Sequence, residues 1–250
     1  MRTLKTMLVS VYVLLIILLL LSLVKCGGDD VAGRDDEALP PVKETFNADV
    51  VMCVDCTGSM DGIIDAIKSN VLDFYPDLRA KCRMHGKVME SMRIRVIGFR
   101  DYDHPRTFEA SDFFSMPEDE AGFKSFVSRL VPEGGDDTPE RGYDALALAI
   151  RSHWRRQPDV HQVIILWTDA PSHPLNPSSP GATDMEQLTA LWQDEMSKRG
   201  KRLIMFSPDD PSWAVLRNAW DNVAWHEVGA GMGLSDMDYE EIVEALSETI

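Results

Sequence analysis

The sequence predicts an α/β fold, a doubly wound and mostly parallel central sheet with helices on both faces and one antiparallel edge strand. Short apolar runs alternate along the chain with stretches in which apolar residues recur every three or four positions. Near-continuous apolar runs are typical of strands buried on both faces, and strand–helix alternation is typical of parallel sheets. The length of 250 residues suits one such domain with an additional N-terminal segment.

The N-terminal segment differs in composition from the rest of the chain. Residues 7–24 are apolar and uncharged, follow two basic residues, and are long enough to span a bilayer. We therefore expect residues 1–25 to be a signal-anchor or a lipoprotein signal peptide. Either one would tether the chain to a membrane with the following domain outside the cytoplasm, at a bacterial envelope or a cell surface.

Cys26 lies just beyond this apolar run. Its position resembles the lipid-attachment site of bacterial lipoproteins, although Lys25 stands where those proteins have a small residue. Lipidation at Cys26 and an uncleaved anchor are therefore alternative expectations. Residues 26–47 are rich in glycine, proline and acidic residues and show no hydrophobic periodicity, which predicts a solvated spacer. The folded domain is expected over residues 48–250.

The expected domain begins with a strand at residues 49–54, followed by apolar residues at helical spacing between 60 and 74. A second strand is expected at 93–99, and the alternating stretch 106–114 predicts the half-exposed edge strand. Apolar residues on one stripe predict a helix over 143–154. Further strands are expected at 163–167, 203–206 and 223–228, with helical stretches between them, and a terminal helix is expected at 239–246.

Acidic and hydroxyl residues cluster in three loops of this predicted fold. Two loops directly follow strands, and the third, residues 134–140, opens the helix of Tyr143. Because the carboxyl ends of parallel strands meet at one edge of the sheet, we expect these loops to line one crevice. Short oxygen-bearing side chains are the ligands that Mg²⁺ prefers. The alternative is that Asp55 caps the following helix and its neighbouring hydroxyls are ordinary N-terminal polar residues.

The loop sequences resemble those of von Willebrand factor A-type (vWA) domains with a metal-ion-dependent adhesion site (MIDAS). DCTGSM, residues 55–60, fits the Asp-x-Ser/Thr-x-Ser motif of that family. GGDDTPE, residues 134–140, resembles the glycine-rich loop of hemicentin-like, α-kinase-linked and integrin β-type members. TDAPSH at 168–173 resembles their third metal loop, and GFRDYDH at 98–104 their second-strand loop. The resemblance extends over residues 48–250.

The resemblance implies a site for one divalent cation, Mg²⁺ first, with Mn²⁺ or Ca²⁺ as alternatives. The implied metal ligands are Asp55, Thr57, Ser59, Glu140 and Asp169. Asp137 matches an acidic position that serves a neighbouring cation in integrin β-type members. Thr138 is a rival to Glu140, because many members use threonine in this loop. The family binds protein partners that present an aspartate or glutamate to the open metal position.

Charge and motifs narrow the functional classes. With 41 acidic and 25 basic residues, the net charge is −16, which disfavours nucleic-acid binding. We expect a membrane-tethered binding module and no catalytic residues. The alternatives are a metal-dependent, phosphatase-like hydrolase that uses the same carboxylates, and a scaffold subunit with a structural metal. Phosphatases of the haloacid-dehalogenase type have Asp-x-Asp-x-Thr after the first strand, whereas Thr57 stands at the second acidic position here.

Overall fold

The computed structural model describes residues 39–70, 73–102, 104–135, 138–194, 196, 200–231 and 239–249. The predicted membrane segment at residues 1–25, Cys26 and Asp137 lie outside this part of the chain. No helix in the described part combines the length and apolar character needed to cross a membrane. The membrane attachment expected from the sequence therefore stays a prediction.

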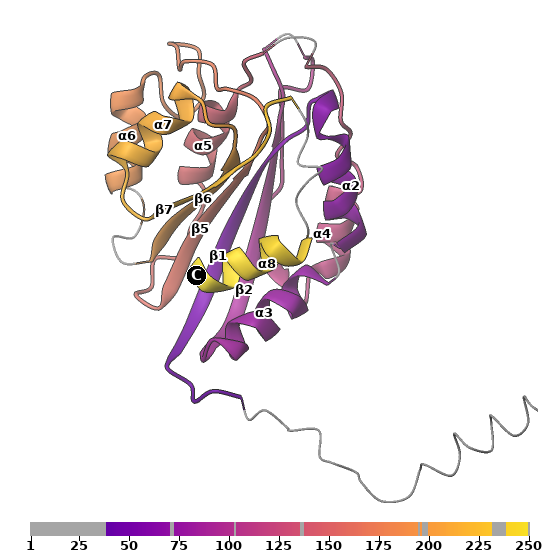
Figure 1. The fold of residues 1–250 in the computed structure, drawn as a ribbon, viewed down its shortest axis with the longest axis vertical. Coiled ribbons are helices and arrows are strands. Elements are labelled where there is room, and N and C mark those ends of the chain that lie inside the picture. The colour runs from indigo at the N-terminus through magenta and orange to yellow at the C-terminus, as the bar shows by residue number, and fades with distance from the viewer. Residues whose placement is uncertain are drawn as a thin grey trace, which may run out of the picture. The chain divides into compact units, whose positions relative to one another are not determined.

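The centre of the domain is a seven-stranded sheet, mostly parallel as predicted (Figure 1). The parallel strands are β1 (Glu44–Asp55), β2 (Lys87–Phe99), β5 (Val160–Trp167), β6 (Lys201–Ser207) and β7 (Val223–Glu227), in the spatial order β2-β1-β5-β6-β7. The first strand lies near the middle of this order. Its two neighbours are β2 and β5, so the residue that ends β1 lies beside the ends of both.

The antiparallel edge differs from the single strand predicted at residues 106–114. Two short strands, β3 (Phe108–Ala110) and β4 (Phe114–Met116), both pair with β2. Three residues of the edge, 111–113, lie opposite only two of β2, which produces a bulge between β3 and β4. Ser111 Oγ accepts a hydrogen bond from the Val96 N–H at 2.9 Å and stabilises this interruption.

Helices cover both faces of the sheet, as expected for a doubly wound fold (Figure 1). One face packs against α2 (Asp61–Asn70), α3 (Phe74–Met84), α4 (Glu120–Val127) and α8 (Tyr239–Thr249). The other face packs against α5 (Gly142–Ile150), α6 (Met185–Asp194) and α7 (Pro211–Ala219). Alternate residues of β1 enter the two cores, Met52 on the first face and Cys53 on the second.

Three element boundaries differ from the sequence expectations. β1 begins at Glu44, inside the spacer predicted to end at residue 47, because Phe46 is buried and stacks on the His161 ring at 4.7 Å. The helical spacing between residues 60 and 74 belongs to α2 and to the start of α3. α5 ends at Ile150, and the Trp154 indole N–H caps its last turn by donating to the Ile150 carbonyl at 2.9 Å.

Candidate metal-binding site at the carboxyl ends of the strands

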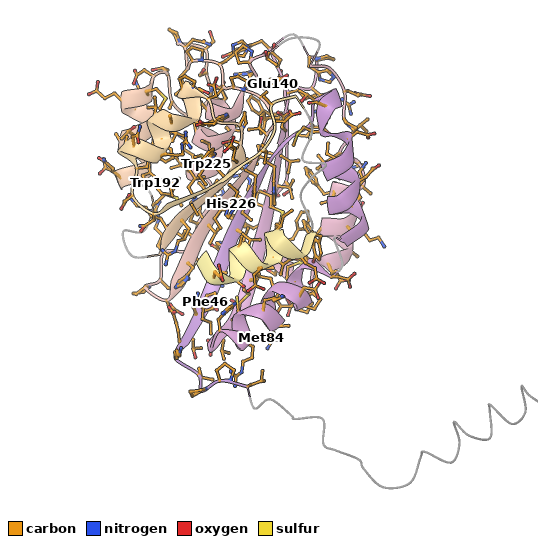
Figure 2. The ribbon with its side chains drawn as sticks, viewed as in Figure 1. Phe46, Met84, Glu140, Trp192, Trp225 and His226 are labelled. Atoms are coloured by element: carbon orange, nitrogen blue, oxygen red, sulfur yellow. The ribbon has the colours of Figure 1, made fainter. Side chains whose placement is uncertain are left out.

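The candidate site lies where β1 and β5 end side by side. The two strands pair in parallel up to Val54 and Trp167, and Asp55 and Thr168 are the residues that follow this last pair. Thr168 Oγ1 donates a hydrogen bond to Asp55 Oδ2 at 2.7 Å. Figure 2 shows Glu140 at this end of the molecule, opposite the end that carries Phe46.

The loop after β1 folds around the buried Asp55 carboxylate. Asp55 Oδ1 accepts hydrogen bonds from the Thr57 N–H at 3.0 Å and from Thr57 Oγ1 at 2.7 Å. Asp55 therefore bonds the residue that precedes the 3-10 turn Gly58–Met60, rather than an N–H within that turn. Asp55 therefore fixes the orientation of the Thr57 hydroxyl and does not cap a helix in the ordinary way.

Two hydroxyls and one carboxylate continue from Asp55 across to β5. Thr57 Oγ1 lies 3.5 Å from Ser59 Oγ, and Ser59 Oγ donates to Asp169 Oδ1 at 2.9 Å. Asp169 is buried and follows Thr168 directly. The backbone carbonyl of Asp169 accepts from the Gly231 N–H at 2.9 Å, which fixes this loop. Four residues predicted as ligands thus form two hydrogen-bonded pairs, Thr57 with Asp55 and Ser59 with Asp169, whose hydroxyl oxygens lie 3.5 Å apart.

The glycine-rich loop brings Glu140 to the first loop. Gly135 has a φ of +82°, and a Cβ there would lie 2.6 Å from Thr57 Cβ and 3.2 Å from Glu140 Oε1. Only a glycine can approach Thr57 this closely in this conformation. The Glu140 N–H donates to the Pro171 carbonyl at 2.9 Å, joining this loop to the one after β5. Glu140 is buried, whereas its rival Thr138 is exposed.

Three acidic side chains, Asp55, Glu140 and Asp169, are buried at this edge of the sheet. Desolvation raises the pKa of Asp55 to about 6, and the neighbouring Asp169 charge acts in the same direction. The hydrogen bonds from Thr57 and Thr168 oppose this rise. Buried carboxylates of one sign are stabilised when a cation lies between them. The cluster of buried carboxylates therefore favours binding of a cation.

The oxygen spacing fits a small, hard divalent cation. Mg²⁺ holds oxygens at about 2.0–2.1 Å in an octahedron, so adjacent ligand oxygens lie about 3 Å apart. The 2.9 Å and 3.5 Å separations along Thr57, Ser59 and Asp169 are close to that value. The carboxylate oxygens of Asp55, Glu140 and Asp169 do not all lie within 4.8 Å of one another. The hydroxyls between them must therefore contribute to any such site.

Several residues at this edge were not among the metal ligands expected from the sequence. Thr168 donates a hydrogen bond to Asp55. The sequence feature that could have indicated this role is a hydroxyl residue directly after an apolar strand. His173 Nε2 lies 2.9 Å from Asp101 Oδ1, and the His173 N–H donates to the Glu140 carbonyl at 2.7 Å. The Arg141 guanidinium stacks over the Tyr102 ring at 4.0 Å. These contacts depend on folding, and no local motif indicates them.

One curated relative shares part of this sequence. No protein-family model matches the chain. The chain is 32% identical over 139 residues to alpha-protein kinase vwkA of Dictyostelium discoideum. The alignment covers 53% of this chain and 21% of the kinase, so the chain spans about a fifth of that relative's length.

Solved structures with similar folds include a pilus adhesin, SpaC from Lactobacillus rhamnosus GG, with a TM-score of 0.48 and 12% identity over 84% of this chain and 30% of the adhesin. A von Willebrand factor type A structure from Catenulispora acidiphila has a TM-score of 0.45 and 15% identity, over 81% of this chain and 43% of that structure's chain. The SpRpn10 VWA domain has a TM-score of 0.47 and 12% identity, over 82% of this chain and 95% of that domain's chain. All three scores are below 0.5, so the proposals below rest on this chain's own loops and sheet order.

Proposed function

We propose that the chain is a vWA-type domain that binds a divalent cation, Mg²⁺ first, at a MIDAS, and through it an acidic residue of a protein partner. The observation that carries this proposal is the row of oxygen atoms from Asp55 through Thr57 and Ser59 to Asp169, each 2.7–3.5 Å from the next. It joins the ends of two adjacent parallel strands, where doubly wound folds bind ligands. Glu140 completes the proposed set from the third loop.

The proposed ligands divide the work between charge and orientation. Thr57 and Ser59 offer neutral hydroxyl oxygens, so the only formal charges come from the carboxylates. Asp55 orients Thr57, and Thr168 in turn holds Asp55. The cation would supply an electrophilic position that a partner's aspartate or glutamate completes. Ser59 is exposed, and it marks the side from which such a partner reaches the site.

A binding module is favoured over the hydrolase alternative by the residue at position 57. Thr57 stands where the phosphatase pattern has its second acid, and its hydroxyl donates to Asp55 instead of offering an acidic proton to a substrate. Hydrolysis of p-nitrophenyl phosphate in the presence of Mg²⁺ distinguishes the two alternatives. We expect the wild type to hydrolyse it no faster than an Asp55→Asn variant does, whereas Mg²⁺-dependent hydrolysis by the wild type would favour the phosphatase-like enzyme.

We also propose that the domain is tethered to a membrane and faces outside the cytoplasm. The apolar composition of residues 7–24 supports this localisation. Nucleic acid is not a proposed partner, because the net charge is −16. Fractionation of cells expressing the full chain, with protease added to intact cells, tests both the tether and the orientation.

The first experiment is calorimetric titration of Mg²⁺ into the full chain in detergent. We expect one equivalent to bind to the wild type and none to Asp55→Asn or Asp169→Asn. Glu90→Gln is the matched control, because Glu90 is an exposed acid near the start of β2. Absence of binding to the folded wild type would contradict the proposal. Loss of the fold in both variants would instead favour the scaffold with a structural metal.

A further inference from the structure

Three potential metal ligands meet where α3 and α8 end. His85 is the C-cap residue of α3, and Glu244 and Glu248 lie one turn apart on α8. One ligand atom from each lies within 4.8 Å of the other two. His85 Nε2 is 3.0 Å from Glu244 Oε1. Figure 2 shows Met84, the neighbour of His85, at the opposite end of the molecule from Glu140.

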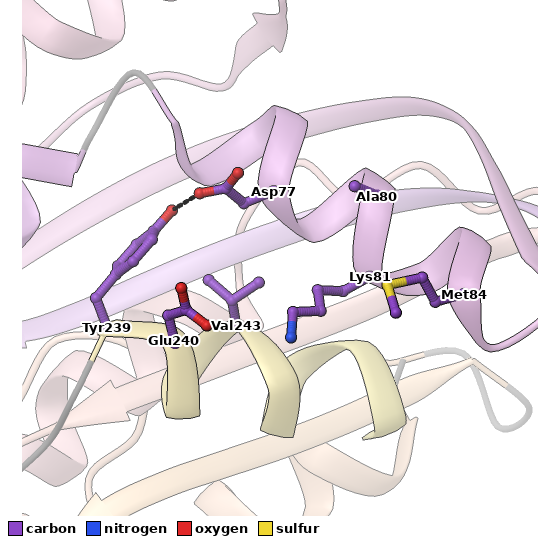
Figure 3. Close-up of a pocket in the computed structure, with 7 residues that line it drawn as sticks. All are labelled: Asp77, Ala80, Lys81, Met84, Tyr239, Glu240 and Val243. Carbon is purple, nitrogen blue, oxygen red and sulfur yellow. Dashed lines mark hydrogen bonds between the residues drawn. The ribbon is translucent and has the colours of Figure 1, made fainter. Parts of the chain in front are cut away.

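The two helices run side by side in the same direction, as Figure 3 shows. Tyr239 donates to Asp77 Oδ2 at 3.1 Å near their first turns, whereas Glu244 meets His85 farther along both. Their C-terminal ends, which carry partial negative charge, therefore converge. The last turn of α8 contains no basic residue, and Glu244 and Glu248 repel each other at a spacing of four. This arrangement favours a bound cation.

The protein already places a cation at this position. Lys81 Nζ lies 2.7 Å from Glu244 Oε2, and Figure 3 shows the Lys81 side chain extending from α3 toward α8 beside a cavity of about 150 Å³. This ammonium group offsets the charge of one carboxylate through Glu244 Oε2, whereas His85 contacts the other oxygen, Oε1. A metal ion would use all three donors and would displace Lys81 from Glu244.

The surrounding contacts hold the three donors in place. Lys87 Nζ donates to the Ser247 and Glu248 carbonyls, each at 3.1 Å, and so fixes the end of α8 against β2. The His85 N–H donates to the Cys82 carbonyl at 3.1 Å. The side chains of His85 and Glu244 keep 35% and 39% of their surface exposed, so an ion from solvent can reach them.

We propose that His85, Glu244 and Glu248 form a second metal site, selective for Zn²⁺ or a similar transition metal over Mg²⁺. One imidazole nitrogen and two carboxylate oxygens are a donor set that Zn²⁺ accepts, with water in the fourth position. Mg²⁺ favours oxygen ligands alone. The thiols in the described part of the chain are poor competitors for zinc, because burial raises the pKa of Cys53 and Cys56 to about 12 and that of Cys82 to about 11.

Zinc titration into the full chain, without a histidine tag and in an Asp55→Asn background, tests this site separately from the first. We expect one equivalent of Zn²⁺ to bind, and this binding to be lost in His85→Gln and in Glu248→Gln. Glu240→Gln removes the same charge about two turns before Glu248 on α8 and should leave binding intact. Lys81→Met should tighten binding, because it removes the competing ammonium.

Two results would overturn the second site. One is the absence of stoichiometric Zn²⁺ binding to the folded Asp55→Asn parent, and the other is unchanged binding in both ligand variants. Mg²⁺ titration of His85→Gln in the otherwise wild-type chain should match the wild type. The two sites can therefore fail independently. Both ligand positions are at the surface, so circular dichroism should show an intact fold in each variant.

Discussion

Asp55 shows how a buried acid is accommodated at the end of a strand. Each of its carboxylate oxygens accepts from a threonine hydroxyl, Thr57 on one side and Thr168 on the other. The hydrogen bonds offset part of the desolvation, and the pKa still rises to about 6. Charge is thus retained at this position at a cost in stability, which is common where a residue serves binding.

The His226 side chain allows the effect of burial on stability to be tested at one residue. It stacks on Phe206 at 4.8 Å, and burial lowers its pKa from the ordinary 6.5. The unfolded chain therefore binds the proton more readily, so this contribution to stability is complete above pH 6.5 and is lost as the pH falls below it. In His226→Phe, which keeps the stacking, urea unfolding should depend less on pH between about 7 and 5.

His153 is an exposed histidine and supplies the control. The His153→Gln variant should keep the pH dependence of the wild type. An unfolding free energy of His226→Phe that falls with acidification as steeply as that of the wild type would show that other groups are responsible.

At the scale of elements, the close approach of Gly135 to Thr57 holds the glycine-rich loop against the loop after β1. Gly135→Ala would place a Cβ 2.6 Å from Thr57 Cβ at a φ of +82°. We expect this variant to be destabilised by about 1–3 kcal/mol and to lose Mg²⁺ binding, since the loop carrying Glu140 must move. Chemical denaturation and calorimetry measure the two effects.

Gly62 supplies a matched glycine within α2. A Cβ there meets nothing within 4 Å, so Gly62→Ala should stabilise the domain by about 0.5–1 kcal/mol and leave metal binding unchanged. Equal effects of the two substitutions on Mg²⁺ binding would contradict the role assigned to Gly135.

Much of this architecture could be predicted because its signals are local. The buried strands β5 and β6 follow from apolar runs, and the parallel sheet then places Asp55 and Asp169 at one edge. The start of β1 could not be predicted, because Phe46 is the one apolar residue of its first four. The bulge after Ala110 depends on register with β2, which no local pattern contains.

Within the candidate site, residue types were predictable and contacts were not. Thr168 bonds an aspartate 113 positions earlier, so its partner emerges only when β1 and β5 pair. The approach of Gly135 to Thr57 likewise depends on how two loops meet after folding. Sequence motifs therefore indicated candidate donors, and the fold supplied the residues that orient them.

For the molecule as a whole, the proposed cation should act on stability by mass action. A ligand that binds only the folded state at about 100 times its Kd adds about 2.7 kcal/mol. For a domain of this size we expect saturating Mg²⁺ to raise Tm by about 5–10 °C after chelator treatment. Differential scanning calorimetry measures the shift, and Asp55→Asn should show none. A Tm of the wild type that does not respond to Mg²⁺ would argue against the site.

The position of β1 determines how the domain can be presented on a surface. β1 joins the sheet at Glu44 and ends at Asp55, so its 12 residues separate the start of the sheet from the loops by about 36 Å. A chip or bead attached through the sequence before Glu44 joins the domain at the end remote from the loops. Immobilisation on the N-terminal side therefore presents the loops outward, and capture assays for a partner should use that orientation.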